Sequence, residues 1–179
     1  ADALLVIIND ILDFSKIEAG KLELEHIHFH LRQLLRETLK PLELRARQRS
    51  LTLRCEVPEE VADGYLGDPG RLRQVLINLV GNAIKFTEEG QVAVRIEARD
   101  GLLHFAVSDT GIGIPADKQQ LIFDAFSQAD SSVTRRFGGT GLGLSIVKHA
   151  VAYHHGTVQL ESQPGKGTTI TVTIPRKQS

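Results

Sequence analysis

The sequence predicts an α/β protein, a two-layer α/β sandwich in which helices cover one face of a mixed β-sheet, preceded by one N-terminal bundle helix. Apolar residues recur at helical spacing in some segments and alternate in others, and the two kinds of segment interleave along the chain. Tight turns, at Asp100-Gly101 and at 164–167, join two pairs of predicted strands. The length of 179 residues fits a single domain with an appendage.

The N-terminal segment, residues 1–19, has an apolar stripe that is wider than a surface helix needs, and no N-cap precedes it. We expect part of a helical bundle here, although a helix that packs on its own domain is the alternative. The sequence has no methionine and opens at Ala1 inside this stripe. We therefore expect the chain to be part of a longer protein.

The remaining residues, 20–179, are expected to form one domain. Leucines at helical spacing predict helices over 31–42 and, after Asp68-Pro69, over 69–86, and a further helix is predicted near 141–153. Cys55 alternates with leucines, so we expect it to be buried. Alternating residues predict strands at 22–24, 51–57, 92–98, 103–107, 157–162 and 168–174.

Composition excludes several classes of function. The chain has 21 Lys and Arg against 22 Asp and Glu, and this formal charge of −1 lacks the basic surplus that nucleic-acid binding requires. One cysteine cannot form an internal disulfide and suits a reducing compartment. No apolar run approaches the roughly 18 residues of a membrane helix. We expect a cytoplasmic location, and leave open whether the parent protein is anchored in the inner membrane.

Asn78, Asn82 and Lys85 lie on one face of the predicted helix 69–86, because they are spaced by four and three residues. Carboxamide oxygens are hard ligands that suit Mg²⁺, and a lysine neutralises phosphate charge. This face therefore favours a magnesium ion bound to phosphates. A solvated polar face is the alternative that the pattern leaves open.

Two glycine-rich segments follow, and each is also compatible with a plain loop. Asp109 ends a predicted strand, where its carboxylate can accept a hydrogen bond from an exocyclic amine while glycines let a flat ligand approach. Residues 138–145 open a helix, whose free N–H groups suit phosphate, but the spacing is that of neither a P-loop nor a Rossmann turn. The polar stretch 127–138 is predicted to act as a lid, with Arg136 or Arg135 reaching a terminal phosphate.

These pieces, in this order, resemble the catalytic and ATP-binding domain of sensor histidine kinases, within the GHKL superfamily. The resemblance covers about residues 20–176 and implies a histidine kinase-type ATPase fold. Residues 3–25 look like the second helix of the dimerisation and phosphoacceptor domain running into the first strand, so that 1–19 would be the C-terminal part of that helix. Residues 126–144 are most similar to hybrid-type kinases. The segments that match the N box, first glycine box, F box, second glycine box and late Gly-Thr-Thr are 78–86, 109–113, 123–126, 139–143 and 167–169.

The resemblance implies ATP and Mg²⁺ as cofactors and a role for each site residue. Asn82, assisted by Asn78, would hold Mg²⁺, and Lys85 would contact phosphate. Asp109 would bind the adenine amino group, and Arg136 would stabilise the γ-phosphate. Gly113 would line the base, Phe86 and Ile114 would pack on it, Thr168 would lie at the adenine end, Leu142 would cover the site, and Gly111, Gly139, Thr140, Gly141 and Gly143 would complete the nucleotide-binding set.

Asn78 distinguishes the histidine kinases from relatives such as gyrase and the Hsp90 chaperones, which have a glutamate there. A water or serine nucleophile needs a base, whereas neutral imidazole already has a free lone pair. The resemblance therefore implies transfer of the γ-phosphate of ATP to a histidine in two-component signal transduction. The alternatives are a degenerate nucleotide-sensing module that only docks partners, and a GHKL-type ATPase.

None of the seven histidines lies in a motif like that of the family's acceptor. We therefore expect the acceptor on a dimerisation domain that this sequence lacks, and no autophosphorylation of this chain. The expected partners are that helical domain, on the same chain or on a sister chain, and a response-regulator receiver domain. The parent protein is expected to be a homodimer, and this part alone is compatible with a monomer. His26, His28 and His30 alternate, which leaves a zinc site open, although a strand-to-helix junction is the preferred interpretation.

Overall fold

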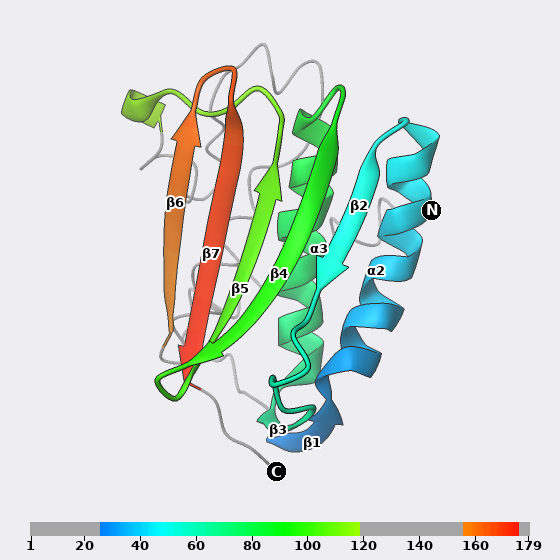
Figure 1. Cartoon of the computed structure of the whole chain (residues 1–179), viewed down its shortest axis with the longest axis vertical. Coiled ribbons are helices and arrows are strands. Elements are labelled where there is room, and N and C mark those ends of the chain that lie inside the picture. The colour runs from blue at the N-terminus through cyan, green and yellow to red at the C-terminus, as the bar shows by residue number, and fades with distance from the viewer. Residues whose placement is uncertain (1–25, 119–155, 176–179) are drawn as a thin grey trace, which may run out of the picture.

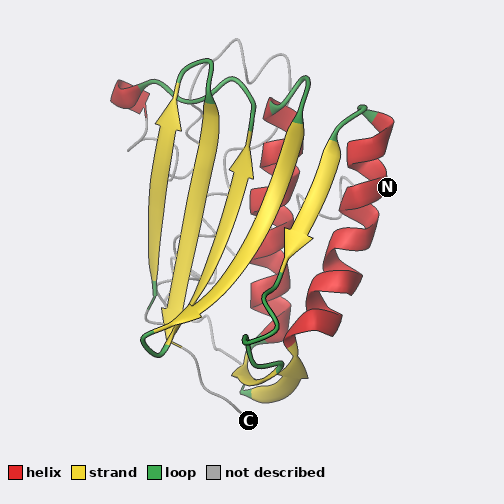
Figure 2. Cartoon of the chain, in the orientation of Figure 1, coloured by secondary structure: helices red, strands yellow, loops and turns green. Residues whose placement is uncertain are grey.

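The computed structural model describes residues 26–118 and 156–175. Within them, two helices lie side by side on one face of a five-stranded sheet, with a two-stranded ribbon at one end (Figures 1 and 2). The predicted two-layer sandwich is confirmed. The predicted helices at 1–19 and 141–153, the strand at 22–24 and the lid at 127–138 lie outside the described residues.

The five-stranded sheet is mixed, as the sequence predicts. Its strand order is β2-β4-β5-β7-β6, with β2 parallel to β4 and every other pair antiparallel. The predicted hairpins are confirmed, because β4 returns as β5 through Asp100-Gly101 and β6 returns as β7. The strands are β2 (Thr52–Glu56), β4 (Gln91–Arg99), β5 (Leu102–Asp109), β6 (Thr157–Gln163) and β7 (Gly167–Pro175).

The two helices, α2 (Leu31–Gln48) and α3 (Pro69–Phe86), both begin at the end of the molecule where β1 (Ile27–His30) pairs with β3 (Gly64–Gly67). Aspartates cap both helices. The Asp68 carboxylate accepts a hydrogen bond from the Arg71 N–H at 3.0 Å, and the Asp63 carboxylate accepts one from the Arg32 N–H at 2.8 Å. These bonds satisfy donors that the first turn of a helix leaves without intrahelical partners.

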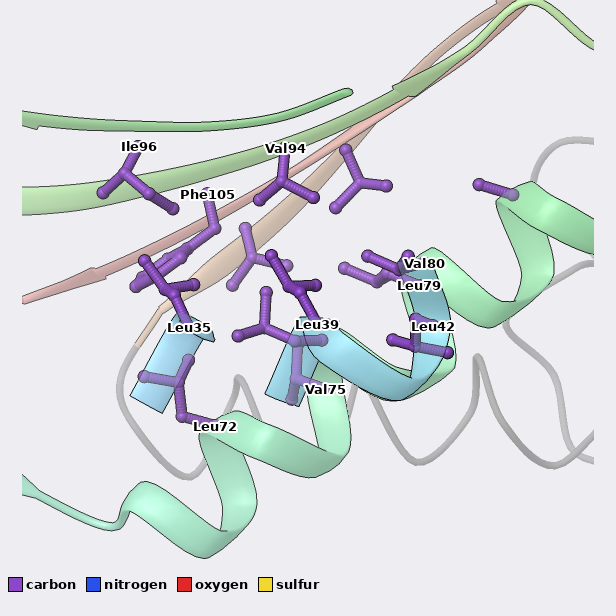
Figure 3. Close-up of a cluster of buried hydrophobic side chains, with 14 of the residues drawn as sticks. Leu35, Leu39, Leu42, Leu72, Val75, Leu79, Val80, Val94, Ile96 and Phe105 are labelled. Carbon is purple, nitrogen blue, oxygen red and sulfur yellow. The ribbon is translucent and has the colours of Figure 1, made fainter. Parts of the chain in front are cut away.

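The core fills the space between the helices and the sheet (Figure 3). Its buried side chains come from one face of each helix and from alternate positions of the central strands, as the two periodicities require. Removing such side chains from water is worth roughly 1.5–3 kcal/mol each. Members include Leu35, Leu39 and Leu42 of α2, Leu72, Val75 and Leu79 of α3, and Val94, Ile96 and Phe105 of the sheet.

One expectation changes in the structure and another is met. Cys55 is exposed rather than buried, because β2 forms an edge of the described sheet and has a neighbouring strand on one side only. His30 immediately precedes α2 and its Nδ1 lies 3.1 Å from Asp63 Oδ2, which agrees with the predicted strand-to-helix junction. Across the described residues, no three His, Cys, Asp or Glu side chains are grouped to hold a metal ion. None of the helices in these residues is long and apolar enough to cross a membrane.

Candidate functional site

The candidate site lies at the end of the sheet opposite the β1–β3 ribbon. Here the C-terminus of α3, the post-β5 loop (residues 110–115) and the turn between β6 and β7 come together. The Ile112 N–H donates to the Phe86 carbonyl oxygen at 3.3 Å, and the Gly165 N–H donates to the Ile112 carbonyl oxygen at 2.7 Å. Main-chain hydrogen bonds on both sides of Ile112 therefore hold the loop between the helix end and the hairpin turn.

Asp109 is the last residue of β5 and the central acid of this site. Its carboxylate is half-buried and accepts a hydrogen bond from the Gly111 N–H at 2.9 Å and one from the Thr168 N–H. Burial raises the pKa of Asp109 above its ordinary value, because it penalises the charged form more than these two bonds favour it. A carboxylate has about four lone-pair sites, and these two N–H groups occupy only two of them. Asp109 can therefore still accept a hydrogen bond from a ligand.

Thr168 lies opposite Asp109 on the neighbouring strand β7. On its other side it lies opposite Ser162 of β6, and the two hydroxyl oxygens are 2.8 Å apart. Ser162 Oγ also accepts a hydrogen bond from the Ile114 N–H at 2.7 Å. Three of the predicted site residues, Asp109, Ile114 and Thr168, are thus joined through hydrogen bonds of the sheet end.

Glycine is required at three positions here because other backbone segments occupy the space of a side chain. A Cβ on Gly111 would meet the Phe86 carbonyl oxygen and would lie 2.9 Å from Asp109 Oδ1. A Cβ on Gly113 would meet the backbone of Gln163 and Pro164, and Gly113 also has a positive φ of 73°. Gly167, with a φ of 101°, is crowded in the same way by the backbone of Asp109. These glycines let three segments approach within backbone contact.

The polar stripe of α3 comprises Asn78, Asn82 and Lys85, and all three are half-buried. They lie apart from the buried face of the helix, which packs on the core through residues such as Leu79 and Ala83. Two carboxamide oxygens one turn apart form a hard, neutral donor set of the kind that suits Mg²⁺ bound to phosphate oxygens. The residues that the structure describes therefore fit the magnesium ion that the resemblance implies.

The structure brings six of the predicted site residues together at the sheet end and places three along α3. The first six are Phe86, Asp109, Gly111, Gly113, Ile114 and Thr168, and the three are Asn78, Asn82 and Lys85. Arg136, Gly139, Thr140, Gly141, Leu142 and Gly143 lie outside the described residues. Sequence reasoning missed Ser162, which ends the predicted strand 157–162 and lies opposite Thr168 in the observed hairpin.

Sequence reasoning also missed Thr110, which anchors the start of the post-β5 loop. Its Oγ1 accepts a hydrogen bond from the Gln91 N–H at 3.1 Å and donates one to the Glu89 carbonyl oxygen at 3.3 Å. The Thr110 N–H in turn donates to the Gln91 carbonyl oxygen at 3.2 Å. Asp109 is therefore held from both sides, by β7 through Thr168 and by the start of β4 through the residue that follows it.

Fold and site together define the class of domain. A half-buried acid ends a strand of a mixed sheet, glycines pack the following loop, and the neighbouring helix has a carboxamide stripe. The sequence profile of the histidine kinase-, DNA gyrase B-, and HSP90-like ATPases matches residues 67–178. The chain belongs to this ATPase family.

Its similar relatives are signal-transduction histidine kinases. The histidine-protein kinase BarA of Escherichia coli strain K12 is 47% identical over 174 residues, covering 94% of this chain and 19% of BarA. In solved structures, full-length ShkA in complex with AMPPNP superimposes with a TM-score of 0.88 at 35% identity, over 99% of this chain and 37% of ShkA. The catalytic domain of histidine kinase ThkA gives 0.72 at 30% identity, over 85% of this chain and 96% of that domain. The chain spans about a fifth of the length of the curated relatives it matches.

Proposed function

We propose that this chain is the catalytic domain of a histidine kinase, which binds ATP with Mg²⁺ and delivers the γ-phosphate to a histidine. The observation that carries the proposal is the environment of Asp109. Its carboxylate is fixed by the Gly111 and Thr168 N–H groups at the end of β5, beside a loop tied to the end of α3. This arrangement suits an adenine amine, and the solved complex of the similar kinase ShkA contains an ATP analogue, AMPPNP.

The polar stripe of α3 supplies the phosphate end of the proposed site. Asn82 and Asn78 would hold Mg²⁺ through their carboxamide oxygens, and Lys85 would contact phosphate. A bound Mg²⁺ neutralises phosphate charge and fixes the orientation of the phosphates. Arg136 and the segment 139–143 complete this part of the proposal on the strength of the family resemblance.

The acceptor histidine is proposed to lie on a helical dimerisation domain, because none of the seven histidines of this sequence lies in an acceptor-like motif. Asn78 supports transfer to histidine over hydrolysis, since its neutral carboxamide is a poor general base for water. A receiver domain would then take the phosphoryl group onto an aspartate. The reaction is placed in the cytoplasm, where ATP is available.

Titration calorimetry with ATP, in the presence and absence of Mg²⁺, tests the binding half of the proposal. The unmutated chain should bind ATP in a magnesium-dependent manner, and Asn82→Ala should abolish this magnesium-dependent binding. Gln33→Ala is the matched control, because it removes an exposed carboxamide that bonds to Glu37 near the start of α2, at the opposite end of the molecule. Magnesium-independent binding by the unmutated chain would contradict the proposed role of the α3 stripe.

Incubation with γ-labelled ATP tests the transfer half. This chain alone should take up no acid-labile, base-stable label and should release little inorganic phosphate. Asn78→Glu, which supplies a base at the position where the hydrolysing relatives have one, should raise phosphate release. Appreciable hydrolysis by the unmutated chain would favour an ATPase over a kinase.

A further inference from the structure

The polar stripe of α3 is continued toward the start of the helix by two further polar residues, Gln74 and Arg71. They lie four and seven residues before Asn78, which places them on the same face of the helix, and both are half-buried. Arg71 Nη1 donates a hydrogen bond to Gln74 Oε1 at 3.2 Å. The Gln74 side chain therefore directs the Arg71 guanidinium along this face, toward Asn78.

The proposed nucleotide extends along this face from the end of α3 toward its start. The adenine is proposed to bind at Asp109, beside the loop that is bonded to Phe86, the last residue of α3 (Figure 1). The proposed phosphate ligands Asn82 and Asn78 precede Phe86 by about 6 and 12 Å along the helix axis, at about 1.5 Å per residue. The terminal phosphate is therefore expected at the Asn78 end of the stripe, on the side of Gln74.

The Arg71 guanidinium lies within reach of that position. Side chains of a helix lean toward its N-terminus, so a group bound by the Asn78 carboxamide lies over the preceding turn, at the level of Gln74. The bond to Gln74 holds the Arg71 guanidinium at the same level. A guanidinium has five N–H donors in a planar fork that fits phosphate oxygens, so the bond to Gln74 is compatible with a phosphate contact.

We propose that Arg71 binds the terminal phosphate of ATP, and that Gln74 is the positioning residue that orients the Arg71 guanidinium for this contact. ADP lacks that phosphate, so the contact with Arg71 favours the substrate of transfer over its product. This inference rests on the proposed function, because it takes the ligand on the α3 stripe to be a nucleoside triphosphate. The role of Arg136 comes from the family resemblance, whereas Arg71 places a second cation for the same phosphate on α3 itself.

Arg71→Gln tests the inference because it removes the guanidinium charge, while the Arg71 main-chain N–H keeps its bond to Asp68 at the start of the helix. The affinity for ATP should fall about tenfold, as expected for one lost charge-assisted hydrogen bond, and the affinity for ADP should stay within about twofold. Titration calorimetry with the magnesium complexes of both nucleotides measures the two dissociation constants, and circular dichroism checks folding. Should Arg71→Gln fail to fold, Arg71→Ala replaces it, because alanine has the highest helix propensity and the same fall is expected.

Arg73→Gln is the matched control. It removes the same charge from the same helix two residues away, but Arg73 lies off the stripe and pairs with Glu37 of α2, at 3.8 Å between Nη2 and Oε2. A general loss of positive charge near the site affects both variants in the same direction, whereas only Arg71→Gln removes the proposed contact. Arg73→Gln should therefore leave the preference for ATP over ADP within about twofold of the unmutated chain.

Gln74→Ala tests the positioning role. Without the Gln74 oxygen, the Arg71 guanidinium is less restricted, so the preference for ATP over ADP should fall, but by less than in Arg71→Gln. Because Gln74 is proposed to act through Arg71, the double variant should show no larger fall than Arg71→Gln alone. Additive falls would show that Gln74 contacts the nucleotide by itself and would overturn its positioning role.

An unchanged preference for ATP over ADP in Arg71→Gln, or an equal fall in Arg73→Gln, overturns the inference. An equal loss of ATP and ADP affinity in Arg71→Gln also overturns it, since Arg71 would then contact a part of the nucleotide that both ligands share. Absence of ATP binding by the unmutated chain contradicts the proposed function itself, whereas ATP binding with an unchanged preference overturns only the roles of Arg71 and Gln74.

Discussion

The two ends of the sandwich are held together by different means. At the ribbon end, where β1 pairs with β3, aspartate side chains cap both helices: Asp63 accepts from the Arg32 N–H and Asp68 from the Arg71 N–H. At the site end, main-chain atoms of separate segments contact one another directly, as between the post-β5 loop and Phe86 (Figure 1). Side-chain caps tolerate exchange at moderate cost, but backbone contact leaves no room for one additional carbon atom.

The glycines also differ in how much space surrounds them. Gly101 in the β4–β5 turn and Gly165 in the β6–β7 turn have φ angles of 76° and 79°, and a Cβ on either would meet nothing within 4 Å. Gly113 has a similar φ of 73°, but a Cβ there would lie 2.9 Å from Pro164 Cα. The turn glycines are therefore needed for conformation alone, and Gly113 for conformation and for close approach.

The largest effect is expected for Gly113→Ala. An L side chain at positive φ costs about 1–2 kcal/mol, and forcing the Gln163–Pro164 backbone aside adds about 1–3 kcal/mol. The free energy of unfolding, from urea denaturation, should fall by about 3 kcal/mol, and ATP binding should weaken with it. Gly165→Ala, which carries the conformational cost without the contact, should lose only about 1 kcal/mol. If both variants lost the same free energy of unfolding, crowding by the backbone would not distinguish Gly113 from the turn glycine Gly165.

A smaller effect is expected at the ribbon end for Asp68→Ala. Loss of a helix N-cap costs about 0.5–2 kcal/mol, and Asp68 is 5% exposed, so the upper half of that range is expected. Urea denaturation again measures the loss, while the affinity for ATP should be retained because the cap lies at the opposite end of α3 from Phe86. A loss of ATP affinity larger than the loss of stability explains would contradict the separation of the two ends.

A similar or slightly smaller effect is expected for Gly101→Ala, which should cost about 1 kcal/mol, as in Gly165→Ala. The two turns lie at opposite ends of the sheet, so similar values would show that crowding rather than position sets the cost of replacing a glycine. Thermal or urea denaturation of both variants side by side is sufficient. If Gly101→Ala lowered the free energy of unfolding by about 3 kcal/mol, the added Cβ would have to be crowded, which would contradict the open space around Gly101.

The smallest effects concern pH, and the two ends should respond in opposite directions. The Arg32 N–H bond and the His30 side chain lower the pKa of Asp63, so the unfolded chain binds more protons below the ordinary aspartate pKa and stability falls on acidification. Burial raises the pKa of Asp109, so the folded chain binds more protons above the ordinary value and stability falls as pH rises through the raised pKa.

Asp63→Asn and Asp109→Asn should each remove one of these slopes from the unfolding free energy measured between about pH 3 and 7. Asp63→Asn should reduce the fall in unfolding free energy that occurs as the pH drops below the ordinary aspartate pKa. Asp109→Asn should reduce the fall that occurs as the pH rises above it. The measurement uses the nucleotide-free chain, so that binding does not contribute to the slope. Changes of the same sign in the two variants would contradict the assignment of opposite shifts to the two acids.

Local sequence signals predicted most of the fold. Helices α2 and α3 and the hairpins around Asp100-Gly101 and 164–167 follow from periodicity and turn residues, which act over short distances. The β3 strand Gly64–Gly67 was missed because its four residues begin and end with glycine and show no alternation. The parallel pairing of β2 with β4 joins segments that are far apart in the sequence, and no local pattern specifies it.

The sequence allowed us to predict which residues form the candidate site, but not which contacts they make with one another. Asp109 and the α3 stripe follow from strand-end and helical spacing, and the family resemblance assigns their chemistry. The crowding of Gly113 by Gln163, and the hydrogen bonds of Ser162, depend on how the β6–β7 turn packs against the post-β5 loop. Such contacts between distant segments are fixed by tertiary packing.

The most direct test of the central claim is titration calorimetry of ATP with Mg²⁺ against three proteins: the unmutated chain, Asp109→Asn and Ser108→Ala. A charge-assisted hydrogen bond contributes about 1.5–3 kcal/mol, so Asp109→Asn should bind about 10–100-fold more weakly. Ser108→Ala, altered at the neighbouring residue on the other face of the sheet, should bind as the unmutated chain does. Unchanged ATP affinity in Asp109→Asn would contradict the claim that this end of the sheet reads the nucleotide.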